Sequence, residues 1–195
     1  MIDDYGFDEF ERNEFPLAYL ITIRTYGTWL HGDERTSVDT HGRNKYGTRR
    51  IKPNLNLEER MLANMKQDAV LLDRRQRQLA DEAIRELCAD RGYDLRALNV
   101  RTNHAHSVVS AQTEPERIAD AMKARATKKL REKGLVPPGS RVWSRGRSRR
   151  RLWKPRHVEA AIRYVLYCQD KASFDEWMHR NGYGDADSNA ETRTE

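Results

Sequence analysis

Two strand-like runs separated by only two residues place the strongest constraint on the fold of this chain. Residues 93–101 (YDLRALNVR) and 104–111 (HAHSVVSA) are rich in apolar and β-branched side chains, and only Thr102 and Asn103 lie between them. So short a connection joins antiparallel neighbours in a hairpin, because parallel strands need a crossover of about a dozen residues or more. The sequence therefore predicts a sheet that is at least partly antiparallel.

The other regular elements complete an α+β pattern. Residues 17–26 (LAYLITIRTY) are β-branched and aromatic, which predicts a buried strand, and residues 149–153 predict a further strand. Apolar residues at helical spacing over 57–90 predict one long helix or two abutting helices. A helix over 113–134 starts with a capping box and a proline at its first position, and a last helix spans 155–169. This order fits a ferredoxin-like (RRM-like) antiparallel sheet with helices on one face.

The length of 195 residues suits one folded domain with modest extensions. We expect an acidic N-terminal extension over residues 1–16, a domain over 17–172 and a polar C-terminal tail over 173–195. Residues 27–56 are rich in Gly, Asn, Asp and Thr, which predicts a long irregular excursion. His31 and His41 fall in this excursion and are interpreted as loop residues.

Composition excludes several classes of protein. Charged residues make up 34% of the chain, mean hydropathy is −0.94, and no run approaches the roughly 18 apolar residues of a membrane span. The acidic N-terminus has no apolar core of a secretory signal, so we expect a cytoplasmic protein without a membrane partner. Cys88 and Cys168 lie far apart, which argues against a disulfide framework or a cysteine-rich zinc site.

The positive charge is concentrated in one stretch. The net charge is +6, and residues 141–156 (RVWSRGRSRRRLWKPR) carry eight Lys or Arg and no acid, so the rest of the chain is at −2, the total less these eight. Basic residues interleaved with aromatics suit single-stranded nucleic acid, since cations follow the backbone and rings stack on unpaired bases. The alternative is a solvated basic loop whose two tryptophans lie in the core. The candidate DNA-binding residues are Arg141, Trp143, Arg145, Arg147, Arg149, Arg150, Arg151, Trp153, Lys154 and Arg156.

The predicted hairpin carries a candidate metal site. Side chains at i and i+2 of a strand point to the same face, so His104 and His106 lie on one side with Cα atoms about 6.5 Å apart. Two neutral imidazoles at that separation can share one divalent metal, and a third ligand must come from elsewhere. The alternative is an incidental, exposed pair.

The last predicted helix carries a candidate functional tyrosine, Tyr164. Val158, Ala161, Ile162 and Val165 form its apolar stripe, and Tyr164 lies about 100° from the centre of that stripe. Tyr164 could be a boundary residue with a wet hydroxyl. Gln169 falls within the stripe itself, where an amide side chain requires a polar partner such as a metal or a phosphate.

These segments together resemble a known family. RTNHAHSVVS, VWSRGRSRRRLW and AIRYVLYCQ resemble the single-tyrosine HUH transposases of the insertion-sequence-200 type, including their REP-associated relatives. The similarity spans roughly residues 17–170. The motifs are a His-hydrophobic-His strand, a Trp and Arg-Gly stretch, and a helical Tyr followed by Gln or Asn. TYGTWLHGDERTSVDTHGRNKYG (residues 25–47) resembles a signature of one subgroup, to which the sequence alone assigns no chemistry.

The resemblance implies a fold, a substrate and a mechanism. It implies an HUH endonuclease fold over residues 17–172 and a transposase that acts on single-stranded DNA, at hairpin ends of an element. His104, His106 and the amide of Gln169 would hold Mg²⁺ or Mn²⁺, with no small-molecule cofactor. Tyr164 would attack the scissile phosphate to form a 5′-phosphotyrosine and a free 3′-hydroxyl, which permits strand transfer. A homodimer is compatible with the resemblance, and the sequence does not show which subunit supplies the tyrosine.

One departure affects the third ligand. In many relatives the amide lies four residues after the tyrosine, whereas here that position is Cys168 and Gln169 follows it. A hard cation prefers the amide oxygen, and a thiolate would indicate zinc, so Gln169 is the predicted ligand. Two alternative functions stay open: a non-catalytic nucleic-acid-binding module, host-adopted or RRM-like, and a metal-dependent phosphoesterase that would not need Tyr164.

Overall fold

The computed structural model describes residues 14–34, 37–38, 50–167 and 174–183. Cys168, Gln169 and His41 lie outside these ranges. The described elements are β1 (Ala18–Thr25), β2 (Ser37–Val38), β3 (Arg50–Ile51), α1 (Leu55–Ala63), α2 (Arg74–Asp90), β4 (Asp94–Val100), β5 (His104–Ser110), α3 (Pro115–Glu132), β6 (Trp143–Leu152), α4 (Pro155–Tyr167) and α5 (Phe174–Arg180).

The main sheet has four antiparallel strands in the order β4-β5-β1-β6. The predicted hairpin is confirmed as β4 and β5, and the buried strand predicted over 17–26 is confirmed as β1, in the middle of the sheet. Thr22 of β1 pairs with His106 of β5, which fixes the register at the candidate site. The further strand is longer than predicted, because β6 pairs with β1 over nearly the whole arginine-rich stretch.

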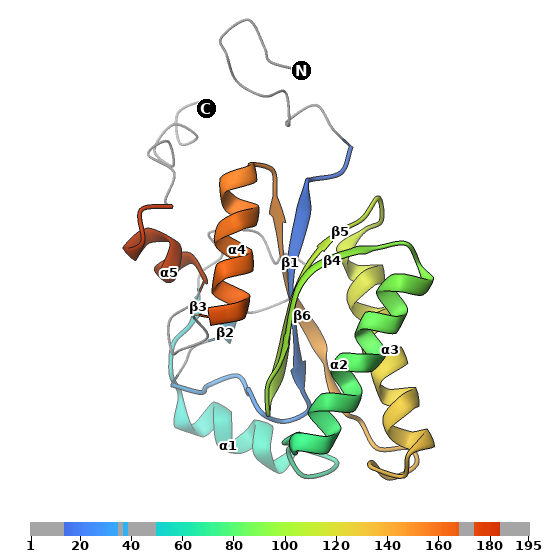
Figure 1. Cartoon of the computed structure of the whole chain (residues 1–195). Helices are drawn as coiled ribbons and strands as arrows, with labels where there is room; N and C mark the ends of the chain where they lie inside the picture. The colour runs from blue at the N-terminus through green and yellow to red at the C-terminus, as the bar shows by residue number, and fades with distance from the viewer. Residues whose placement is uncertain (1–13, 35–36, 39–49, 168–173, 184–195) are drawn as a thin grey trace, which may run out of the picture.

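Helices cover both faces of this sheet (Figure 1). Tyr19, Ile21 and Ile23 of β1 point to one face and are buried in a core with α2 and α3. Ala18 and Leu20 point to the other face and are buried in a second core with α4. The α+β antiparallel sheet is confirmed, with a correction: α2 and α3 share one face as expected, but α4 lies on the opposite face. β1 is apolar at alternate positions on both sides, so both faces require cover.

The helix boundaries refine the sequence analysis. Of the two possibilities predicted over 57–90, the structure has two helices, α1 and α2, which are separated by residues 64–73 and so do not abut. Asp73 and Gln76 form a reciprocal capping box at the start of α2. α3 begins at Pro115 as predicted, but the expected capping box is wrong, because its N-cap is Glu114 and no side chain caps it. Glu116 instead forms an ion pair with an arginine of β6.

The folded part of the chain extends beyond the boundary predicted at residue 172. α5 lies within the range expected to be a polar tail, and its Phe174 and Met178 are buried against α4. Within the described ranges, no helix combines the length and the apolar content that a bilayer span requires.

Candidate functional site

The two histidines of β5 lie on the face of the sheet that α4 covers. Their ring centroids are 4.6 Å apart and the ring planes are inclined at 73°. His104 Nδ1 lies 2.6 Å from the side-chain oxygen of Asn103, which accepts a hydrogen bond, and His106 Nδ1 lies 2.8 Å from the hydroxyl of Thr22. Partners at Nδ1 fix the ring orientation and leave Nε2 of each ring as the nitrogen for a metal.

Both imidazoles are held in the neutral form. Burial, followed by the nearby charges of Arg24 and Arg101, lowers the pKa of His104 to about 4. Burial, then His104 and the same two arginines, lowers the pKa of His106 to about 3. Neutral imidazole is the form that binds metals, so neither ring would have to lose a proton to bind one at neutral pH.

The structure brings Tyr164 to this pair. Its ring centroid lies 5.6 Å from that of His106, and the side chain is only 5% exposed. Asn99 of β4 donates a hydrogen bond of 3.1 Å to the carbonyl of Val165, which ties α4 to the sheet beside the site. Tyr164 is therefore a packed residue and not the boundary side chain of the alternative interpretation. Tyr167, one turn further, is 79% exposed.

Comparison with known protein families identifies the family of this chain. Residues 56–159 match the family model described as "Transposase IS200 like", which is more than half of the chain. This chain belongs to the IS200-like transposase family. The resemblance inferred from the motifs is thereby confirmed. The matched range includes both histidines and β6, and it ends before Tyr164.

Two solved structures are similar to this transposase. One is a putative transposase from Deinococcus radiodurans, with 17% sequence identity and a TM-score of 0.42, covering 83% of this chain and 96% of that one. The other is a REP-associated tyrosine transposase bound to a REP hairpin, with 12% identity and a TM-score of 0.45, covering 86% of this chain and 69% of that one. None of the curated proteins matches the sequence.

The described residues supply two of the ligands that a divalent cation would need. Two neutral imidazoles with oriented Nε2 atoms supply nitrogen ligands of the kind that such ions accept. In the described part of the chain, no group of three His, Cys, Asp or Glu side chains gathers around a common point. Both predicted candidates for the third ligand, Gln169 and Cys168, lie outside the described residues.

The arginine-rich stretch of the transposase is divided between the two faces of the sheet. Successive side chains of β6 alternate, and three of its arginines point towards α3, where each meets a carboxylate. The pairs are Arg147 with Asp120 at 3.0 Å, Arg149 with Glu116, and Arg151 with Glu114 at 3.0 Å. These arginines form a ladder with α3, on the face opposite to the histidines.

Arg150 is the arginine of this run that points to the histidine face. It pairs in register with Leu20, and its guanidinium carbon lies 5.3 Å from the centroid of the Phe174 ring. Trp143 is 7% exposed and belongs to the core under α2 and α3, so the core alternative is confirmed for this tryptophan. The remaining candidates are at least partly exposed: Arg141, Arg145, Trp153, Lys154 and Arg156.

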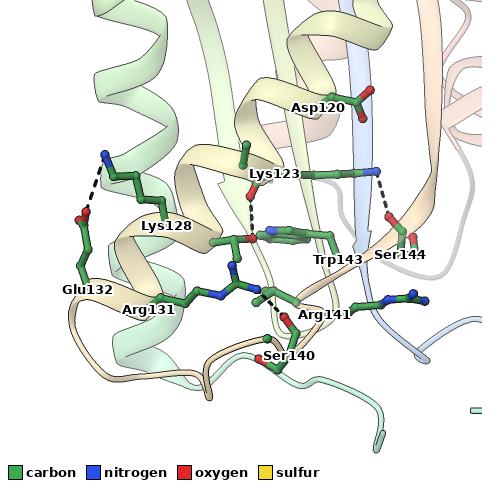
Figure 2. A pocket seen from close by; sticks show the side chains of 13 residues that line it. Asp120, Lys123, Lys128, Arg131, Glu132, Ser140, Arg141, Trp143 and Ser144 are labelled. Carbon is green, nitrogen blue, oxygen red and sulfur yellow. Dashed lines mark hydrogen bonds and ion pairs between the residues drawn. The ribbon is translucent and has the colours of Figure 1, made fainter. Parts of the chain in front are cut away.

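A groove between α3 and the start of β6 lies on the face away from the histidines (Figure 2). Lys123 reaches across it and donates to the carbonyl oxygens of Ser144, Arg145 and Gly146 at 3.0, 3.2 and 2.8 Å. Burial and the charge of Arg147 lower the pKa of Lys123 to about 8. Lys123 therefore stabilises the start of β6 through these three hydrogen bonds.

Sequence analysis missed the residues that support the histidines. Thr22 and Asn103 hold the two Nδ1 atoms, and Arg24 brings positive charge to both rings. One signal was available: alternation along residues 17–26 puts Thr22 and Arg24 on the same side of their strand. Their position opposite the histidines depends on strand order and register, which the sequence alone does not give.

Proposed function

We propose that this chain is a metal-dependent single-stranded DNA endonuclease and strand transferase with Tyr164 as its nucleophile. The observation that carries the proposal is the placement of Tyr164 against a pair of oriented, neutral histidines, with ring centroids of His106 and Tyr164 5.6 Å apart. Membership of the IS200-like transposase family supports DNA as the substrate. The family resemblance supports hairpin-forming single strands as the first substrates to test.

The chemistry is a displacement at phosphorus. The Tyr164 oxygen attacks the scissile phosphate and the bond from phosphorus to the 3′ oxygen breaks. The phenol loses a proton, and the leaving 3′ oxygen takes one up to become the free 3′-hydroxyl. Mg²⁺ or Mn²⁺ on Nε2 of His104 and His106, with Gln169 as the proposed third ligand, would supply positive charge at the phosphate oxygens. The phosphotyrosine keeps the energy of the phosphodiester, so a second 3′-hydroxyl can reverse the reaction and complete strand transfer.

Basic residues of the transposase would guide the DNA strand. Arg150 lies on the histidine face, and exposed cations follow at both ends of β6, so these are the proposed backbone contacts. Trp153 is the tryptophan available to stack on a base. The proposed partners at the ends of the strand are Arg141, Arg145, Lys154 and Arg156. The proposal includes the cytoplasmic location expected from the sequence.

The test is a covalent trapping experiment. Labelled hairpin-bearing single-stranded DNA is incubated with Mn²⁺ and protein and resolved on a denaturing gel. Wild type is expected to give a protein-DNA band that is absent with Tyr164→Phe and His106→Ala. Tyr167→Phe is the matched control, since this exposed phenol lies one turn away and its loss should leave the band intact.

Other results of this experiment would support a different nucleophile or a different function. Cleavage that survives Tyr164→Phe but not His106→Ala would favour a phosphoesterase that uses water. A band lost with Tyr167→Phe would move the nucleophile to that residue. Binding of a panel of hairpins without cleavage would favour the non-catalytic nucleic-acid-binding module.

A further inference from the structure

Residues 25–29, the start of the subgroup segment, form a turn that is hydrogen-bonded to Asn103, the residue before the first histidine. The backbone N–H and the hydroxyl of Thr25 both donate to the carbonyl of Asn103, at 2.9 and 3.1 Å. The Thr28 hydroxyl lies 3.1 Å from the carbonyl oxygen of Thr25 and 3.4 Å from that of Asn103, so it can donate to either. Because the Asn103 side chain orients His104, this turn sets the position of the candidate metal ligand.

The turn is itself fixed from both sides. Tyr26 N–H donates to the carbonyl of Val142, and the Tyr26 carbonyl accepts from Val70 N–H, both at 2.9 Å. Gly27 has a φ of +73°, which L side chains rarely adopt, and a Cβ at this position would lie 3.0 Å from the backbone Cα of Ala69 as well as 2.4 Å from the flexible end of Met65. The turn therefore requires glycine and has little freedom to shift.

Arg24 stands between this turn and the histidines. It pairs in register with His104, so the two side chains leave the sheet on the same face. Its guanidinium carbon lies 3.5 Å from the centroid of the Trp29 ring, a stacked cation–π contact that holds the group in place.

We propose that Arg24, held by Trp29, binds the scissile phosphate of single-stranded DNA beside the His104–His106 pair and stabilises the charge that develops when Tyr164 attacks it. This inference rests on the proposed function and assigns a role to the subgroup segment, which that function leaves unused. In this proposal Arg24 binds the phosphate, and Trp29 positions Arg24.

The chemistry of the groups suits this role. A phosphodiester carries one negative charge, and attack by a phenolate adds a second to the transition state. A guanidinium offers parallel N–H donors that match two phosphate oxygens, and it stays charged at any pH at which the protein is folded. A cation already stacked on an indole loses little freedom on meeting its anion, so its stabilisation is preorganised.

The first experiment compares cleavage rates on the hairpin substrate at saturating Mn²⁺. Arg24→Gln is expected to cleave about 100-fold more slowly than wild type, as for the loss of one preorganised transition-state donor. Trp29→Leu, which keeps the charge and loses its support, should cost about 2- to 5-fold. Arg85→Gln is the matched control, because this arginine pairs with Asp81 on the outer surface of α2, and it should stay within about twofold.

A second experiment removes the charge from the DNA instead of the protein. Once the cleaved phosphate is mapped, oligonucleotides carry either a phosphate or a neutral methylphosphonate at that position, and binding to Tyr164→Phe protein is measured in EDTA. The methylphosphonate should weaken binding about 10-fold when Arg24 is present. The two oligonucleotides should bind equally when Arg24→Gln is added, and Arg85→Gln should retain the difference.

The outcomes separate the two levels of the proposal. Wild-type protein that forms no covalent product with any hairpin overturns the proposed function and this inference with it. Wild-type cleavage with Arg24→Gln at an unchanged rate overturns the inference alone. If Arg24→Gln fails to fold by circular dichroism, the methylphosphonate penalty in Tyr164→Phe protein still decides, because equal binding of the two oligonucleotides excludes a contact with that phosphate.

Discussion

Acid should destabilise the metal-free protein through its two site histidines. Folding lowers the pKa of His104 to about 4 and that of His106 to about 3, from an ordinary value of 6.5, mainly because both rings are buried. At least about one pH unit above 6.5, both are neutral in the folded and unfolded states and their titration has little effect on stability. As the pH falls below 6.5, the unfolded chain takes up protons that the folded chain does not, so the free energy of unfolding decreases.

The size of this loss follows from the pKa shifts. Each pH unit below 6.5 costs up to about 1.4 kcal/mol per histidine until the folded-state pKa is reached. Between pH 7.5 and pH 4.5 the two rings together should cost about 3 to 5 kcal/mol, the lower figure allowing for their mutual interaction. Domains of this size have free energies of unfolding of about 5 to 15 kcal/mol, so the effect is a large fraction of the total.

Urea unfolding in EDTA measures this loss directly. Wild type and the His104→Gln/His106→Gln double variant are unfolded at pH 7.5, 5.5 and 4.5 and followed by far-UV circular dichroism. Carboxylates titrate in both proteins and cancel in the comparison, so the gap between them isolates the histidines. A gap that stays constant with pH would mean that the rings titrate as exposed histidines do, and the argument for a neutral, metal-ready pair would be refuted.

Three further predictions address the site and its support. A mixture of Tyr164→Phe and His106→Ala proteins should form no covalent DNA product, because each chain places both groups in one site, and recovered activity on the gel would show that the tyrosine comes from a partner. Thr22→Val should weaken Mn²⁺ binding by about 10- to 100-fold in calorimetry, since it removes the Nδ1 partner of His106, and unchanged affinity would contradict that role. Gly27→Ala should lower the free energy of unfolding by about 1 to 3 kcal/mol in urea, because the backbone has a positive φ and a Cβ there would crowd the backbone of Ala69, and an unchanged midpoint would show that the turn adapts.

The predictable parts of the fold are those that depend on neighbouring residues. A two-residue connection could only be a hairpin, and period-two alternation was enough to place His104 and His106 on one face. The stripe on α4 correctly indicated a packed helix. It could not indicate which face of the sheet the helix covers, because an apolar stripe packs equally well against either face of a strand that is apolar on both sides.

The arginine-rich stretch shows why the other features of the fold and the site could not be predicted from the sequence. A run of arginines has the composition of a loop, and its identity as a strand depends on pairing with β1, more than a hundred residues earlier in the chain. The acids that neutralise three of these arginines are on α3, roughly thirty residues before them, and only the folded structure brings the two together. The motif marked Tyr164 as a candidate nucleophile, whereas its approach to His106 depends on how α4 crosses the sheet.

Period-two alternation in β6 also changes the interpretation of the charge. Counting residues suggested eight cations for DNA, but three of them are engaged with carboxylates on the face opposite to the histidines. On the histidine face, Arg24 of β1 pairs in register with His104, and Arg150 of β6 pairs with Leu20 further along the same strand. Under the proposed function, binding of the scissile segment would depend on a few placed guanidinium groups, and the net charge of the run overstates the number of phosphate contacts. A strand presents only alternate side chains to any one face. The number of arginines in the sequence of β6 therefore does not give the number that can contact DNA on the histidine face.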